Sequence, residues 1–180
     1  MMTKRSGWFV ALCLGAALSG CNQANVRQEE ERSSSAEANM ELGILYMREG
    51  KKAVALELLQ KAIDQDPNLA EAHNAIAVLY ENLGETDKAD EHFRRAISLD
   101  PKNSQAHNNY GGFLCRQQRW DAAEESFLKA VSNPLYETPE VAYTNAGICA
   151  NTAKDPDKAE TYWRKALEVN PRFPAALLQM

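Results

Sequence analysis

Cysteine and histidine side chains are the groups in this 180-residue chain that could bind a metal or form a covalent bond. His73 and His107 lie 34 residues apart, but no cysteine or acidic residue completes a set of zinc ligands with them, and His92 is interpreted as a surface helix residue. The sequence has no CxxC, HExxH or GxSxG motif and no glycine-rich phosphate loop. We therefore expect packing histidines, with no catalytic residue, no metal, no cofactor and no enzyme activity.

The amino-terminal segment has the pattern of an export signal. Lys4 and Arg5 precede an eleven-residue apolar run, which is shorter than the roughly 20 residues that span a bilayer. The run ends in Leu18-Ser19-Gly20-Cys21, which resembles the bacterial lipobox. This resemblance implies that residues 1–20 are a lipoprotein signal peptide and that Cys21 is acylated. The alternative is an ordinary signal with a chance cysteine.

The residues after Cys21 bear on where the protein is located. Asn22, rather than an aspartate, follows the cysteine, and in the lipoproteins that the motif resembles this favours a lipid anchor in the outer membrane, facing the periplasm. The net charge of −5 argues against a nonspecific nucleic-acid binder and gives no attraction to anionic lipid, so the acyl chains must supply the anchoring. Residues 21–35 are polar and are predicted to form a flexible tether; a solvated helical extension is the alternative.

A period of about 34 residues runs through the rest of the chain, marked by small residues at Gly43, Ala77, Gly111 and Gly147. Each is followed by an alanine after twelve residues, a large apolar residue after sixteen and a second alanine after nineteen. This pattern resembles the tetratricopeptide repeat (TPR), which implies an all-α, right-handed superhelical solenoid of antiparallel helix pairs. The predicted TPR domain, residues 36–180, comprises repeats 36–69, 70–103, 104–139 and 140–173 and a partial fifth, 174–180, which suggests a chain that continues past Met180.

The spacing has a physical rationale. Small residues on the first helix of each pair allow the second helix to approach closely, and the two alanines lie seven residues apart on one helix face. Gly50 and Gly84 fall in the turn between paired helices, where we expect a positive φ. Asp66-Pro67 and Asp100-Pro101 are expected to end one pair and begin the next, because proline disfavours helix at the preceding residue.

Cys115 and Cys149 are the thiols that remain when Cys13 leaves with the signal and Cys21 is acylated. In stacked repeats, both belong to the faces that neighbouring first helices present to each other. We predict a disulfide between them in the oxidising periplasm, closing a loop of about 34 residues. Two buried, reduced thiols remain the alternative, because free cysteine is itself commonly buried.

First helices of stacked repeats are expected to line an inner, concave face. Positions to either side of the packing residue then form a partner-binding groove, which comprises Met40, Ile44, Met47, Asn74, Val78, Asn108, Gly112, Arg116, Thr144 and Ile148. This mixture of amides and apolar side chains suits an extended or helical peptide. The missing side chain of Gly112 would leave room for a partner's backbone; alternatively, Gly112 relieves crowding and the amides are solvated.

Lipobox, tether and repeat array together resemble the PilF/PilW family of type IV pilus biogenesis lipoproteins. Most of the specificity lies in Asn108-Asn109-Tyr110-Gly111 and Tyr143-Thr144-Asn145-Ala146-Gly147. The resemblance implies a pilotin, a non-catalytic scaffold that binds the pilus secretin and promotes its outer-membrane localisation and multimer assembly. No nucleic acid or small-molecule substrate is implied.

The repeat itself is shared by many scaffolds, which leaves a second function open. The chain could be a general periplasmic TPR lipoprotein that serves as an adaptor for cell-wall enzymes or for another secretion system. An enzyme would need active-site residues in a further carboxyl-terminal part.

Overall fold

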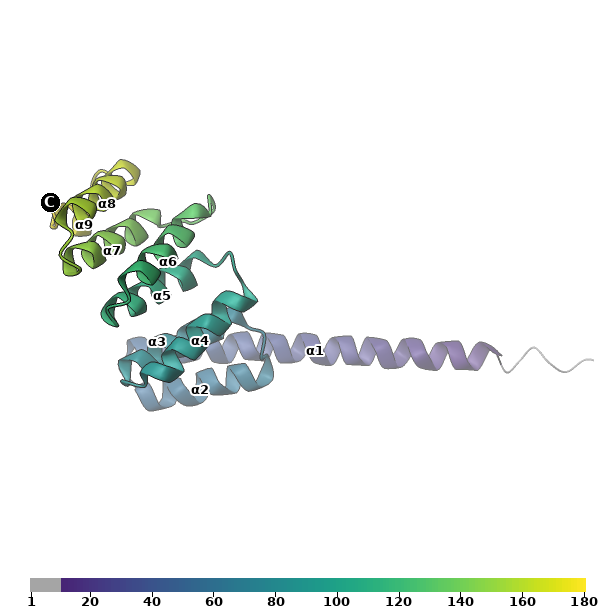
Figure 1. The fold of residues 1–180 in the computed structure, drawn as a ribbon. Coiled ribbons are helices and arrows are strands. Elements are labelled where there is room, and N and C mark those ends of the chain that lie inside the picture. The colour runs from purple at the N-terminus through teal and green to yellow at the C-terminus, as the bar shows by residue number, and fades with distance from the viewer. Residues whose placement is uncertain (1–10) are drawn as a thin grey trace, which may run out of the picture.

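The computed structural model describes residues 11–180, with side chains from residue 27 onward. Helices make up the regular structure of this part of the chain, in which no strand occurs. In chain order they are α1 (Ala11–Arg48), α2 (Lys52–Gln65), α3 (Ala70–Asn82), α4 (Thr86–Leu99), α5 (Ser104–Arg116), α6 (Trp120–Ser132), α7 (Pro139–Thr152), α8 (Pro156–Val169) and α9 (Pro174–Leu177) (Figure 1).

Consecutive helices pack as pairs, and the pairs stack into a solenoid. α1 packs against α2, α3 against α4, α5 against α6 and α7 against α8, and each pair also contacts the next. Figure 1 shows the pairs rising from α1 and α2 to α7 and α8, with each turned relative to the one before. The short α9 follows the fourth pair and buries Ala176. The predicted all-α TPR superhelix is confirmed.

A close contact between the two helices of each pair fixes their separation. A Cβ atom added to Gly111 on α5 would lie 2.7 Å from Cε1 of Phe127 on α6, a distance that real Cβ contacts essentially never show. Phe127 is itself almost fully buried. The glycine therefore makes room for the large ring opposite, as the 34-residue pattern predicts. Equivalent contacts join Gly43 to Leu59 and Gly147 to Trp163.

Aromatic side chains between repeats make the core continuous. Phe93 on α4 packs against Phe113 on α5, with ring centroids 5.4 Å apart, and both rings are buried. Burial of one such ring contributes about 1.5–3 kcal/mol relative to its exposure. The second repeat is thereby joined to the third through apolar contact, as a solenoid without long-range connections requires.

The turn inside each pair places one residue in the left-handed region. Gly50 and Gly84 have φ values of 75° and 80°, as expected from their residue type. Gln118 and Lys154 occupy the same place in the third and fourth repeats, with φ values of 59° and 66°. A side chain in this region crowds its own backbone, so the last two turns are strained where the first two are not.

Residues 21–35 lie within α1, which corrects the prediction of a flexible tether. From Asn22 to Asn39 the sequence contains neither glycine nor proline and is rich in alanine, glutamine, glutamate and arginine, which favour helix. Side chains 27–32 are exposed, so this segment is a solvated extension of the first TPR helix. The predicted signal peptide, residues 1–20, begins outside the described residues, and the side chain of Cys21 lies outside them too.

Relief of the strain at position 118 should stabilise the protein. Gln118→Gly is expected to raise the free energy of unfolding by about 0.5–1 kcal/mol, because the left-handed penalty disappears while the unfolded chain gains some freedom. Chemical denaturation of the purified protein measures this change. Gln117→Gly is the matched control: its φ is −82°, so it should destabilise the protein. Equal effects of the two substitutions would contradict the assignment of strain to position 118.

Candidate functional site

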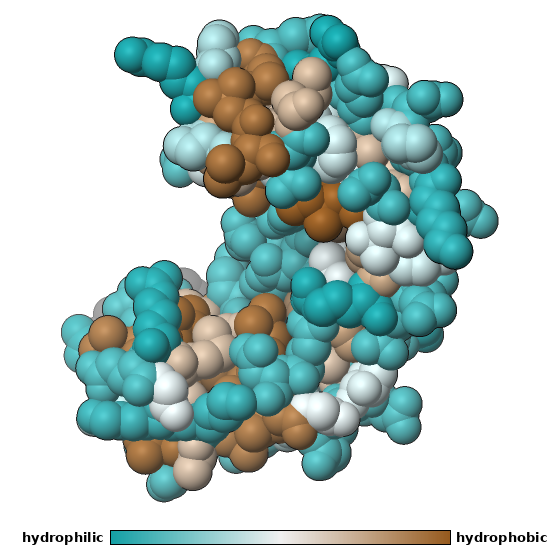
Figure 2. Space-filling view, turned by 90° about the vertical axis from the view of Figure 1, so that its left-hand side faces the viewer, coloured by the Kyte–Doolittle hydropathy of each residue, from teal (hydrophilic) through white to brown (hydrophobic). Residues whose placement is uncertain are grey.

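The first helices of the four repeats lie side by side and form the inner face of the solenoid. α1 contacts α3, α3 contacts α5, and α5 contacts α7. Figure 2 shows the resulting C-shaped surface, with a deep hollow between its two ends and hydrophobic patches on both sides of a polar middle. A hollow of this kind can hold a segment of another protein along several repeats.

Apolar side chains lie at the first-repeat end of this face. Met40, Ile44 and Met47 on α1 are partly buried and pack against the core of the first two repeats. Val78 on α3 is also partly buried, whereas Ile148 on α7 is 40% exposed. The groove therefore offers apolar contact at both ends, and Ile148 presents the most accessible of these side chains.

Side-chain amides connect neighbouring first helices across the face. Asn109 on α5 donates from Nδ2 to Oδ1 of Asn74 on α3, at 3.2 Å. Asn145 on α7 donates in the same way to Asn108 on α5, at 3.0 Å. These amides hold one another in fixed orientations, so they contribute to the spacing of the repeats as well as to the polarity of the groove.

An ion pair crosses the groove in its middle. Arg116 on α5 donates from Nε to Glu81 Oε1 at 2.5 Å and from Nη2 to Oε2 at 2.7 Å, a bidentate arrangement. A Cβ added to Gly112 would lie 3.3 Å from Nη1 of the same arginine. The space left by Gly112 is thus occupied by the arginine and is not open to a partner's backbone, as the crowding alternative had it.

Two of the predicted groove residues are not accessible. Asn108 is 5% exposed and Thr144 is 2% exposed. Asn108 accepts the bond from Asn145, and the Thr144 hydroxyl donates to the carbonyl of Glu140 one turn earlier. Both predictions are corrected: these side chains position the helices, because adjacent first helices approach too closely to leave them exposed.

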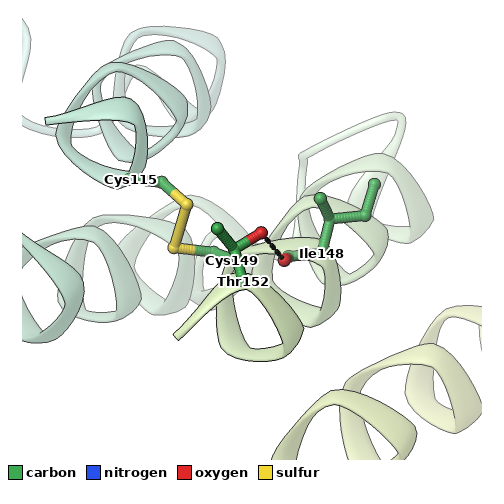
Figure 3. Close-up of a disulfide and its surroundings, with 4 residues drawn as sticks. All are labelled: Cys115, Ile148, Cys149 and Thr152. Carbon is green, nitrogen blue, oxygen red and sulfur yellow. Dashed lines mark hydrogen bonds between the residues drawn. A yellow bond between two sulfur atoms is a disulfide. The ribbon is translucent and has the colours of Figure 1, made fainter. Parts of the chain in front are cut away.

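A disulfide links α5 to α7 on the inner side. Cys115 and Cys149 are joined, with Cα atoms 5.7 Å apart and 34 residues between them in sequence. Figure 3 shows the bond between the two helices and the Ile148 side chain pointing away from it, while Thr152 donates from Oγ1 to the Ile148 carbonyl. Closure of a loop of this length stabilises a fold by about 2–4 kcal/mol. The third and fourth repeats are therefore fixed relative to each other.

The histidines form a structural pair that the sequence did not reveal. Nδ1 of His73 lies 3.0 Å from Nδ1 of His92 on α4, and Nε2 of His73 lies 3.2 Å from the Pro67 carbonyl. The carbonyl requires a proton on His73 Nε2, so a neutral His73 accepts at Nδ1 from His92. His92 is half-buried and paired, which corrects its interpretation as a surface residue.

The equivalent histidine of the third repeat makes the same backbone contact. His107 Nε2 lies 3.0 Å from the Pro101 carbonyl, so the repeat period correctly predicts its packing role. Among the described residues, no cluster of three or more histidine, cysteine or acidic side chains could hold a metal ion. Nor does any described helix have an apolar stretch long enough to cross a membrane.

Comparison with known proteins agrees with this architecture. Tetratricopeptide repeat models match residues 70–103, 92–125 and 141–173, and a TPR repeat model matches residues 43–84. No curated protein matches the sequence. Among solved structures, YrrB, a TPR protein with an unusual peptide-binding site, is 21% identical, with a TM-score of 0.66 over 91% of this chain and 86% of its own. At that identity it shows the fold alone.

Two solved structures are more similar in sequence. PilF of Pseudomonas aeruginosa is 35% identical, with a TM-score of 0.79 over 83% of this chain and 68% of its own. PilW, a widely conserved type IV pilus biogenesis factor, is also 35% identical, with a TM-score of 0.74 over 78% of this chain and 64% of its own. This chain therefore spans about two thirds of the length of either protein.

Protonation of the histidine pair should weaken the fold. Burial lowers the pKa of both His73 and His92, and the neighbouring His73 lowers that of His92 further. Because the folded state favours the neutral rings, their contribution to stability is present above the unfolded pKa of about 6.5 and is lost as the pH falls through the folded values. The free energy of unfolding should fall between about pH 7.5 and about pH 5. Denaturation at each pH checks this, and His92→Leu should flatten the profile; an unchanged slope in that variant would contradict the assignment.

Proposed function

We propose, from the premise that this chain belongs to the PilF/PilW family of tetratricopeptide-repeat type IV pilus factors, that it is an outer-membrane lipoprotein scaffold for the pilus secretin. In this role it binds the secretin and promotes its localisation and multimer assembly through protein–protein contacts. The observation that carries the proposal is the 35% identity to PilF over most of both chains. The sequence Leu18-Ser19-Gly20-Cys21 supports the lipid anchor.

The inner face supplies the binding surface in this proposal. It offers apolar side chains at Met40, Ile44 and Ile148 and hydrogen-bonding groups at Asn74 and Arg116. The amide and ion pairs that brace the face keep it in one shape before a partner arrives, which reduces the ordering cost of binding. A secretin segment lying along several first helices would contact both ends of the groove.

Substitution of Ile148 tests the inner face. Ile148→Arg should abolish surface pili and heat-resistant secretin multimers in a deletion strain, because a buried cationic side chain at a binding contact costs at least about 2 kcal/mol. Leu128→Arg is the matched control, since Leu128 is 42% exposed on the second helix α6 and Ile148 is 40% exposed on the first helix α7. Normal piliation with Ile148→Arg, in a protein that is folded and correctly localised, would contradict binding at this face.

The lipid anchor is tested in the same strain. Cys21→Ala removes the proposed acylation site and leaves the TPR array unchanged, so the protein should keep its helical spectrum, leave the outer-membrane fraction and fail to place secretin multimers there. Retention of the variant in that fraction when the secretin is absent would refute the lipid anchor while leaving the proposed groove intact.

A further inference from the structure

The fourth repeat lacks two large side chains that the other repeats carry. One first-helix position holds Leu42, Ile76, Tyr110 and Ala146 in successive repeats, and the position one turn later holds Tyr46, Tyr80, Leu114 and Ala150. Both alanines are almost fully buried. Because nothing replaces the missing volume, a partly open cavity of about 210 Å³ lies between α6, α7 and α8.

The preceding repeat boundary shows how such a space is normally filled. There the Tyr110 ring from α5 extends toward α4, and its hydroxyl donates to Asp90 at 3.0 Å. Arg119 also donates to Asp90, at 3.0 Å. The acid of the second repeat is thus covered by side chains of the third. At the next boundary, Ala146 stands in place of the tyrosine and leaves the equivalent wall exposed to the cavity.

The cavity has an apolar floor and a wall with excess negative charge. Ala146, Ala150 and Ala153 form one side, together with Cys149, and Trp120 adds an aromatic surface. Three carboxylates and one ammonium group line the rest, which leaves a formal excess of two negative charges; they are Asp121, Glu124, Asp155 and Lys158.

The carboxylates at the cavity are not equally available. Glu124 is already satisfied, because Tyr162 donates its hydroxyl to Oε1 at 2.5 Å and Lys158 pairs with Oε2 at 3.0 Å. These two contacts lower the pKa of the Glu124 carboxyl, with the tyrosine contributing most. Asp155 uses Oδ1 to cap α8, and Asp121 lies on the first turn of α6. The unneutralised charge at the mouth therefore comes from Asp121 and Asp155.

We propose that this cavity receives a lysine or arginine side chain of a partner protein. The aliphatic stem would lie on the alanine floor beside Trp120, and the cationic head would pair with Asp121 and Asp155. A long basic side chain matches such a site because its stem is apolar while its head is charged. A cation beside an indole gains further attraction. This contact is separate from the proposed secretin groove, since its charged groups come from the second helices and the turn between α7 and α8.

Binding of small basic probes to the purified full chain tests the proposal. Nα-acetyl-arginine amide should shift the amide resonances of Ala150 and Ala153 in heteronuclear NMR spectra, and its affinity should fall as salt increases. Nα-acetyl-norleucine amide has an apolar side chain without the charge and should bind more weakly. Equal binding of the two probes, or shifts confined to other parts of the chain, would overturn the proposal.

Two substitutions separate the floor from the charged wall. Ala150→Leu restores a side chain of the size found in the third repeat, so it should abolish arginine-amide binding while the chain keeps its fold. Asp121→Asn should weaken binding about threefold, whereas Asp87→Asn, at the equivalent position of the second repeat, should leave it unchanged. Undiminished binding in Ala150→Leu would refute the site. If Ala150→Leu does not fold, the double variant Asp121→Asn/Asp155→Asn decides, because unaltered affinity there would refute it equally.

Discussion

The separation between the two helices of each repeat is the constraint on which the rest of the structure depends. Phe127 fills the space between α5 and α6, and only a residue without a side chain at position 111 allows it to do so. Repetition of this contact aligns the second helices on the outside. The first helices are then held side by side, and their shared surface becomes the inner face of the solenoid. A general binding surface thus results from a packing requirement.

Polar and covalent links between first helices then set the shape of that face. Glu81 and Arg116 join α3 to α5, Asn145 joins α7 to Asn108 on α5, and the disulfide reinforces the second of these junctions. Apolar packing alone would hold the repeats together but would leave their relative rotation softer, because aliphatic and aromatic contacts are less directional than hydrogen bonds. The links therefore favour a preorganised groove over a flexible one.

The sequence predicts whatever depends on the repeat period and misses what depends on contacts across helices. The positive φ of Gly50 and Gly84 follows from residue type, whereas Gln118 carries no such mark and its place in the period is the only signal. The burial of Asn108 depends on how closely α5 and α7 approach, and the pairing of His92 depends on the crossing of α3 and α4. The helical extension of α1 was predictable in principle, since its composition favours helix as much as it disfavours a core.

Site-specific photo-cross-linking in cells tests most directly whether the inner face of this pilus factor contacts the secretin. A photoreactive residue in place of Val78, on the first helix α3, should yield a cross-link to the secretin. The same residue in place of Val54, which is 41% exposed on the second helix α2, should yield none. Cross-links from position 54 without any from position 78 would place the partner on the outer face and contradict the account.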